Sequence, residues 1–319
     1  MRENFNNIWP KPKIRKKNFN KNFNLKHKKN KLNKIENYFS DQFGYHSKLF
    51  PSGRACLGVI FRYLNLGKDK YVFLNKWSSN SLISSVGHYC NISSNFKDSS
   101  VIINNHQWGD ENRLKVRDKI IIEDSCDSII LNKKTLFINN SKFEFFSLPK
   151  IIGSFSGGIV ISKDKKFLKF CNYEQRKNIE FGISQFKSKL KNIKKNYLKD
   201  TNFWFNEAHN TYCDYNSLED IDANLKYYEY NKNKIQKRLI ILKKLFNTKI
   251  TGRIGPVFPI PLKKLKNVKK IKKMFLIRHK ISKNNMSKFH KCVLLPVHFN
   301  ITDNQFKMFL NILIKNLKK

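Results

Sequence analysis

The chain has 319 residues, of which 40% are hydrophobic, and its 64 basic and 23 acidic residues leave a formal net charge of +41. This length favours a large domain plus a smaller one, and the apolar content excludes a wholly disordered chain. Such a charge is typical of proteins that bind nucleic acid, anionic membranes or other polyanions. The lysines, however, are spread over nearly the whole chain, which fits a drift in amino-acid usage with Lys as the default solvated residue. We favour drift, so the charge by itself names no partner.

The spacing of cysteines, histidines and apolar residues excludes several classes of protein. The six Cys lie far apart without a Cys-x-x-Cys pair, which is typical of reduced thiols in a cytoplasmic protein. The eight His have no metal-binding spacing, so we expect no metal. No apolar run reaches the length of a membrane span and no apolar region follows the basic N-terminus, so we expect neither a membrane helix nor a secretory signal. The expected location is the cytoplasm.

The first 34 residues differ in composition from the rest of the chain. No acidic residue occurs between Glu3 and Glu36, while Lys, Arg and Asn alternate with isolated Phe and Leu. This composition predicts a basic, flexible N-terminal arm over residues 1–34. Two interpretations stay open: contact with something anionic, or a solvated extension lying on a partner subunit.

From Ile35 the pattern becomes globular and alternates between helices and strands. Apolar periodicity predicts helices at 35–39, 56–64 and 79–86, the last ending at Gly87. Short apolar runs predict five strands: 71–74, 101–103, 120–122, 143–146 and 158–161. This alternation predicts an open, mostly parallel α/β sheet with right-handed crossovers, which forms a large domain over residues 35–215.

The remainder, residues 216–319, is predicted to form a long helix and a small C-terminal α+β domain. The long helix spans 218–245, with an apolar face made by Tyr227, Tyr228, Ile235, Leu239 and Leu242. Short strands at 257–260 and 293–295 and a terminal helix from Asp303 follow it.

The first of three segments that carry candidate chemistry is the turn at the start of helix 56–64. It comprises Ser52, Gly53, Arg54 and Ala55. Backbone N–H groups at a helix N-terminus, freed by a glycine turn, form an anion site that suits phosphate. Taken alone, Ser-Gly before a helix is more often only a cap.

The second segment ends the predicted strand 120–122 with Glu123 and Asp124. Ligands of open α/β sheets bind at the carboxyl ends of the strands. A carboxylate there can keep a pyridinium nitrogen protonated, because opposite charges favour the ionised pair. Taken alone, this segment more simply predicts an Asp that caps the next turn.

The third segment places Lys150 after the strand 143–146, on a turn with Pro149 and before Gly157 and Gly158. A Lys at the mouth of a sheet, in a partly desolvated site, has a lowered pKa and can attack an aldehyde to form an imine. Any single Lys in so basic a chain is far more often solvated. Its position between two apolar strands distinguishes Lys150.

Taken in order, the segments resemble the DegT-type (DegT/DnrJ) aminotransferases, pyridoxal-phosphate (PLP) enzymes best known for aminating keto sugars bound to nucleotides. Residues 52–55 resemble the family's Ser-Gly-x-Ala phosphate turn, Glu123-Asp124 its strand end, and Lys150 its lysine before a Gly-Gly strand. Residues 294–303 resemble its closing strand and last helix. The resemblance covers about residues 35–319. It implies a fold-type-I PLP-dependent transferase that forms a homodimer.

By this resemblance, Lys150 would carry the cofactor PLP covalently and later move protons between cofactor and substrate. Asp124 would hold the pyridine nitrogen, whose protonation makes the ring an electron sink. Trp77 would stack on the cofactor ring, although packing is an equal interpretation and Ser78 or Ser79 could take that place instead.

The resemblance also implies a phosphate site. The backbone of Gly53, Arg54 and Ala55, together with the hydroxyl of Ser147, would bind the cofactor phosphate. The arm 1–34 supplies no catalytic group, and we expect it to be dispensable for cofactor binding.

Three positions depart from the family pattern. Asp127 stands where the family has His or Gln near the cofactor's ring hydroxyl, and a carboxylate there repels a phenolate-like oxygen unless one of them is protonated. Phe145 stands where many members have Ser, which leaves Ser147 as the substitute. The Asn-x-Arg segment that members lend to the neighbouring subunit has no clear match near residues 214–217. An atypical branch, or a member without activity, would carry such differences.

The expected function is transfer of an amino group, from glutamate, to a nucleotide-linked keto sugar in surface-polysaccharide biosynthesis. One alternative is another PLP reaction such as dehydration; Lys150 counts against it, because the dehydratase branch has His there. Another is a basic protein of the same fold that binds nucleic acid or another polyanion. We do not expect nucleic acid as a partner, because the basic residues have no focus outside the arm.

Overall fold

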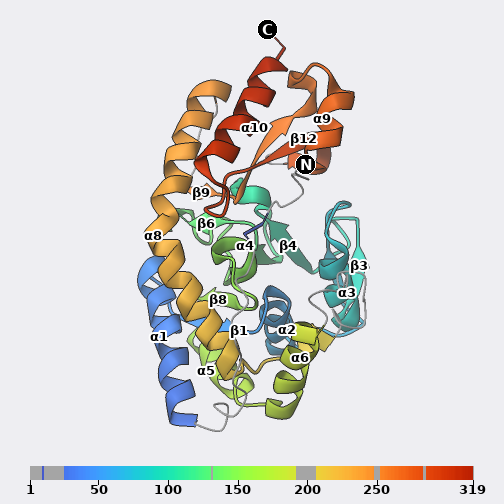
Figure 1. The fold of residues 1–319 in the computed structure, drawn as a ribbon. Coiled ribbons are helices and arrows are strands. Elements are labelled where there is room, and N and C mark those ends of the chain that lie inside the picture. Colours follow the sequence, from blue (N-terminus) through green and yellow to red (C-terminus); the bar gives the residue numbers. More distant parts are fainter. Residues whose placement is uncertain are drawn as a thin grey trace.

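The structure, a computed structural model, describes residues 9–10, 25–130, 132–191, 206–247, 252–282 and 285–318. A seven-stranded sheet with its helices forms one part of the molecule, and a three-stranded sheet with two helices forms the other (Figure 1). The long helix α8 (Tyr215–Phe246) runs along one side of both parts.

The large sheet is mostly parallel, as predicted. In sheet order its strands are β1 (Ser47–Phe50), β8 (Gly158–Ser162), β7 (Phe143–Ser147), β5 (Ile120–Asp124), β4 (Val101–Asn105), β2 (Tyr71–Phe73) and β3 (Asn91–Ser93). The five strands from β7 to β3 are parallel, whereas β8 is antiparallel to β7 and β1 to β8. The connection from β7 to β8 holds only the short helix α4 (Leu148–Ile152), and this is too short for a parallel crossover.

Helices cover both faces of this sheet. They are α1 (Leu25–Phe43), α2 (Gly53–Tyr63), α3 (Asn80–Tyr89), α5 (Lys165–Glu174) and α6 (Ile179–Lys191). One apolar core fills the space between the sheet and α2, with Val59, Ile122 and Phe143 among its buried residues. A second core joins the other face to α1, α8 and the small domain. Helix α3 continues to Tyr89, past the predicted stop at Gly87, because a single glycine weakens a helix without ending it.

Helix α1 begins at Leu25, so the last ten residues of the expected flexible arm are helical, and that part of the prediction is wrong. Ile35 and Phe39 lie on a buried face of α1. Lys34 Nζ lies 2.9 Å from Asp222 Oδ1 of α8. The acidic partner of Lys34 lies 188 residues away in the chain, so the local composition looked uniformly basic and indicated an arm.

The small domain matches its prediction and adds detail. Its sheet has the order β10 (Val257–Pro261), β12 (Asn285–Pro296) and β11 (Ile277–Ser282), and its helices are α9 (Val268–Met274) and α10 (Asp303–Lys315). Two short strands, β6 (Ile129–Ile130) and β9 (Arg253–Ile254), pair between the two domains. Helix α10 begins at the predicted Asp303, behind a Thr302 capping box.

The described residues lack two features, a membrane-spanning helix and a metal-binding cluster. None of their helices combines the length and the apolar character that crossing a bilayer requires. They also contain no cluster of three or more His, Cys, Asp or Glu suited to holding a metal ion.

Candidate active site

A cavity of about 260 Å³ lies at the carboxyl ends of β4 and β5, which is the edge where open α/β sheets bind ligands. Four of the predicted site residues line it together: Lys150, Asp124, Asp127 and Trp77. The alternatives to Trp77, Ser78 and Ser79, also line it.

Asp124 is the last residue of β5 and is buried. Its Oδ1 accepts a hydrogen bond from the backbone N–H of Cys126 at 3.0 Å, and its Oδ2 accepts one from Asn105 Nδ2 at 3.0 Å. The residue therefore caps the following turn and also presents its carboxylate to the cavity. The capping interpretation is confirmed, and the carboxylate keeps lone pairs for a further partner, so its role toward a pyridinium nitrogen stays a prediction.

Lys150 lies in the short helix α4, whose first turn contains Pro149 and which ends at Gly153 in a left-handed conformation. Its Nζ lies 2.7 Å from Asp127 Oδ1. Burial lowers the pKa of the Lys150 ammonium, but the charge of Asp127, with smaller contributions from Cys126 and Asp124, raises it above its ordinary value. The predicted lowering of the Lys150 pKa is therefore wrong, because the sequence did not reveal that Asp127 pairs with it.

Burial and the neighbouring charges also shift the pKa of Asp127. Burial raises the pKa of the Asp127 carboxyl, Lys150 counteracts this, and the nearby Asp124 carboxylate adds to the rise. A carboxylate with a raised pKa, hydrogen-bonded to an ammonium, is well placed to receive its proton.

The predicted phosphate turn lies beside this cavity and does not line it. Ser52 caps α2, its Oγ accepting a hydrogen bond from the backbone N–H of Ala55 at 3.1 Å. A Cβ added to Gly53 would lie 2.9 Å from Cys126 Sγ and 3.7 Å from Ser147 Cβ, so little more than a hydrogen fits there. The N-terminus of α2 thus adjoins Ser147. It also adjoins Cys126, which belongs to the loop that follows Asp124.

The side chain of Arg54 forms an ion pair with the buried Glu207, so we assign it no contact with the phosphate. Only its backbone N–H belongs to the predicted turn. Phe145 is buried in the core against α2. Because side chains alternate along a strand, Ser147 lies on the same face of β7 as Phe145 and can reach the Gly53 turn.

The small domain supplies the opposite wall of the cavity through β11. The Trp77 ring stacks on His279, with ring centres 3.8 Å apart and planes 6° apart. Gln107 donates a hydrogen bond to the His279 carbonyl at 3.0 Å and accepts one from the Ile281 N–H at 2.9 Å. One face of Trp77 therefore has a protein partner, and Arg278 adds a positive charge to this wall.

Comparison with known proteins identifies the family. The family described as "Putative PLP-dependent aminotransferase" matches residues 35–317. The chain belongs to this family. It is a transaminase whose cofactor is PLP, with amino-group donors and acceptors as small-molecule substrates. No curated protein matches the chain.

Solved structures agree with the fold of this PLP-dependent aminotransferase. "Putative sugar aminotransferase Spr1654" from Streptococcus pneumoniae, in its PMP form, has a TM-score of 0.57 at 12% identity, and the alignment covers 97% of each chain. DesV from S. venezuelae has a TM-score of 0.56 at 11% identity, over 88% of this chain and 87% of that one. At these identities the likeness establishes a fold-type-I α/β architecture.

The residues of the cavity fit PLP by their chemistry. Lys150 offers an amine, and Asp124 a buried carboxylate with free lone pairs, in one cavity. The adjoining N-terminus of α2 offers N–H donors to an anion. Residues 214–217, where the Asn-x-Arg segment has no clear match, begin helix α8 with Asp214 as its cap.

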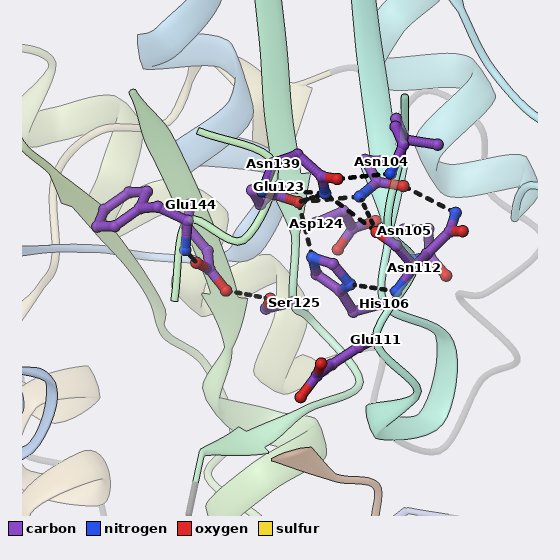
Figure 2. A network of polar contacts seen from close by, with 12 residues as sticks. Asn104, Asn105, His106, Glu111, Asn112, Glu123, Asp124, Ser125, Asn139 and Glu144 are labelled. Atoms are coloured by element: carbon purple, nitrogen blue, oxygen red, sulfur yellow. Dashed lines mark hydrogen bonds and ion pairs between the residues drawn. The ribbon is translucent and has the colours of Figure 1, made fainter. Parts of the chain in front are cut away.

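A buried network behind Asp124 was not found from the sequence (Figure 2). His106 Nε2 and Glu123 Oε2 lie 2.7 Å apart, and both side chains are fully buried. Glu123 also accepts hydrogen bonds from Asn104 Nδ2 at 2.9 Å and from the Asn139 N–H at 3.0 Å. Burial alone would raise the pKa of Glu123, but the charge and hydrogen bond of His106, with those of Asn104 and Asn139, lower it to about 2. The His106 N–H bonds the Asp124 carbonyl at 2.9 Å, so the network fixes the backbone of the catalytic candidate.

A second buried network holds the same loop from the side of the small domain. Arg253 of β9 places Nη1 2.6 Å from Glu144 Oε1 of β7, and both side chains are fully buried. Ser125, next to Asp124, donates to Glu144, as Figure 2 shows. The sequence contained no signal for this contact, because Arg253 and Glu144 are 109 residues apart and look like ordinary surface charges.

Trp9 is a further cavity residue that the sequence analysis did not single out. It lines the cavity with Lys150, although it belongs to the arm that we expected to be dispensable for cofactor binding. An isolated Trp in a basic segment has no periodicity that could have indicated a site.

Proposed function

We propose that Lys150 carries PLP and that Asp124 holds the pyridine nitrogen. The observation that supports this proposal is that both side chains line one cavity of about 260 Å³ at the carboxyl end of the parallel strands. When bound, PLP supplies the electron sink that stabilises a carbanion at the substrate carbon. The Asp124 carboxylate keeps the ring nitrogen protonated, and the His106–Glu123 network keeps Asp124 in place.

Asp127 takes part through Lys150. The neutral amine of Lys150 is the form that bonds to the cofactor aldehyde, so the ammonium first loses a proton. Asp127 Oδ1, at 2.7 Å from Nζ, raises the pKa of Lys150 and so opposes the loss of that proton in the cofactor-free protein. By the family resemblance, Asp127 would neighbour the cofactor's ring hydroxyl and would hold a proton near Lys150.

The phosphate of the cofactor is assigned to the N-terminus of α2. The N–H groups of Gly53 and Arg54 lie there beside Ser147, and the Ala55 N–H would be shared between the phosphate and Ser52 Oγ.

The substrates are proposed to be glutamate as amino donor and a nucleotide-linked keto sugar as acceptor, for surface-polysaccharide biosynthesis. The likeness to a protein described as a sugar aminotransferase supports the sugar. The β11 wall supports the nucleotide, since His279 offers an aromatic ring and Arg278 offers a charge for phosphate. Trp77, which stacks on His279 from the large domain, keeps its proposed place beside the cofactor ring. In this proposal the enzyme is an atypical member of the DegT-type branch and works as a homodimer.

Borohydride reduction of PLP-saturated protein, followed by peptide mapping, tests the lysine. We expect the reduced adduct on Lys150, and its loss in Lys150→Arg. Lys163→Arg serves as a matched control, because Lys163 is an exposed lysine beyond the end of β8. An adduct on another lysine would overturn the assignment.

Turnover tests the substrates separately. Protein loaded with cofactor is incubated with ¹⁵N-glutamate and a panel of keto-sugar nucleotides, and ¹⁵N in the sugar is measured by mass spectrometry. Label in a sugar product supports the proposal. Conversion of glutamate with no labelled sugar from any acceptor of the panel would contradict the proposed acceptor class.

A further inference from the structure

The ring of Trp9 lies over the candidate lysine. Lys150 Nζ is 4.9 Å from the centre of the Trp9 ring, and Trp9 lines the same cavity as Asp124 and Asp127. A cation at this distance from the face of an indole is attracted by the ring quadrupole. The Lys150 ammonium thus has two neighbours: it forms an ion pair with Asp127 and a cation–π contact with Trp9.

Apolar contacts with both domains hold Trp9 in this position. Its ring packs against Trp108, which follows β4, and against Val257 and Leu294 of the small sheet. Trp108 has a φ of 54°, a left-handed backbone conformation that is unfavourable for a bulky residue. Such strain persists where the surrounding contacts stabilise it, and it is concentrated at functional sites. Pro10, which follows Trp9, is buried as well.

We infer that Trp9 is a binding residue of the active site, which holds the Lys150 side chain and limits the size of the acceptor. This inference rests on the proposed role of Lys150. With the indole 4.9 Å from Nζ, the Lys150 side chain is still 34% exposed, so Trp9 covers one side of the amine and leaves another open. The ring lines the cavity and packs against the cluster that contains Val257 of β10 and Leu294 of β12, so it lies between the cavity and the small sheet.

Two consequences separate this role from simple packing. The ring stabilises the ammonium form, so its removal makes the amine of Lys150 available at lower pH. The ring also narrows the cavity, so its removal admits bulkier acceptors while the reaction with a small amino donor is unchanged. A residue that only filled space in the core would change stability and neither of these properties.

The first test uses cofactor-free protein. Trinitrobenzenesulfonate modifies neutral amines, and peptide mapping reports its rate at Lys150 as a function of pH. In Trp9→Leu we expect the rate at Lys150 to rise roughly fivefold and its pH midpoint to fall, since a cation–π contact of this kind shifts an equilibrium by about that factor. Trp9→Phe, which keeps a ring, should stay near the wild type. Tyr230→Leu is the control for loss of an aromatic side chain, because Tyr230 is 84% exposed on α8.

The second test follows the ring itself. Tryptophan emission is recorded while PLP is titrated into the wild type and into Trp9→Phe. If Trp9 lies beside the cofactor, the quenching by PLP should be smaller in the variant, although the chain keeps three other Trp.

The outcomes distinguish the inference from the proposed function. A borohydride adduct on Lys150, combined with labelling and quenching that do not change in Trp9→Leu and Trp9→Phe, overturns the role of Trp9 and leaves the proposed function standing. Absence of any adduct on Lys150 in PLP-saturated protein overturns both. Faster labelling in Trp9→Leu, rescue by Trp9→Phe and an adduct on Lys150 support both.

Discussion

At the scale of single residues, the chemistry depends on which charges surround Lys150. A free lysine is protonated near neutral pH, and burial in a cavity would by itself favour the amine. Asp127 reverses that effect and raises the Lys150 pKa. Cofactor loading should therefore be limited by loss of this proton.

We predict that Asp127→Asn accelerates PLP uptake. Without the carboxylate, burial remains as the main influence and lowers the pKa of Lys150, so more neutral amine is present at any given pH. Uptake at pH 7.5, followed by the absorbance of the bound cofactor, should be faster by about tenfold or more, which corresponds to a pKa change of at least one unit. Asp127→Glu keeps the charge and should behave like the wild type. Equal uptake rates in wild type and Asp127→Asn would contradict the proposed ion pair.

Asp124→Asn should weaken PLP binding with little effect on folding. The Asn Oδ1 can still accept from the Cys126 N–H, so the turn remains capped. The charge-assisted hydrogen bond to the pyridine nitrogen, worth about 1.5–3 kcal/mol, is lost, which lowers affinity roughly 10- to 100-fold. Equilibrium titration with PLP and denaturant unfolding measure the two effects. An unchanged PLP affinity would make Asp124 a structural cap only.

At the scale of elements, the loop after β5 is supported by two buried networks, and each connects it to a different neighbour. His106–Glu123 joins it to β4, and Arg253–Glu144 joins it to the small domain. Breaking a buried pair by removing one partner costs about 3–5 kcal/mol, because the other charge stays buried without compensation. Both networks therefore position Asp124 without touching the cavity.

Glu123 gives the protein a measurable dependence of stability on pH. Its folded pKa of about 2 lies below its ordinary value of 4.5, so its contribution is present above pH 4.5 and is lost as the pH falls toward 2. Between pH 6 and 3.5 the wild type should lose about 1.4 kcal/mol more unfolding free energy than Glu123→Gln does. Urea unfolding of both proteins at the two pH values measures this difference. Parallel pH dependence in the two proteins would show that Glu123 is not ionised in the fold.

The turn before α2 depends on a glycine because of Cys126. We predict that Gly53→Ala destabilises the protein by about 1–3 kcal/mol, since the new Cβ would lie 2.9 Å from Cys126 Sγ. Combining it with Cys126→Ala should recover part of that loss, and the double-mutant cycle should show a favourable coupling. Additive losses in the cycle would place the strain elsewhere in the turn.

At the scale of the whole molecule, the excess of positive charge of the described residues lies on the surface. Among the described residues, four basic side chains are buried: Lys28, Arg238, Arg253 and Lys280. Of the described Lys and Arg residues, Lys150 and Arg278 line the cavity. This distribution agrees with lysine as the default solvated residue and gives the charge no focus at the site.

Replacing Lys264, Lys269 and Lys270 by Gln should therefore leave PLP binding and amino transfer intact. These exposed residues lie on the small domain, outside the cavity. Any affinity for DNA or RNA should be weak, indifferent to sequence and steeply reduced by salt, because it would come from counterion release alone. Binding measured at two salt concentrations, alongside turnover on the acceptor panel, checks this. Tight, sequence-selective binding with no turnover would favour the nucleic-acid alternative.

The sequence by itself predicted the architecture and four of the residues that line the cavity: Lys150, Asp124, Asp127 and Trp77. Period-2 and period-3.6 patterns are local, so five strands of the large sheet, the long helix 218–245 and the terminal helix at Asp303 could be predicted within a few residues. The strands β1, β3 and β11 were not predicted, and only the end of β12 was. Lys150 and Asp124 could be proposed because each follows a buried strand, and parallel strands end at one edge of a sheet.

Only the tertiary structure decided what surrounds them. The pKa of Lys150 depends on Asp127, which is 23 residues away, and the wall opposite it comes from β11 and from Trp9. Helix α1 reaches back to Leu25 because its lysines find acids on α8. These contacts join segments far apart in the chain, and electrostatic energy depends on distance in space and on burial. Neither quantity is contained in local sequence periodicity, so the site's elements could be predicted and its electrostatics could not.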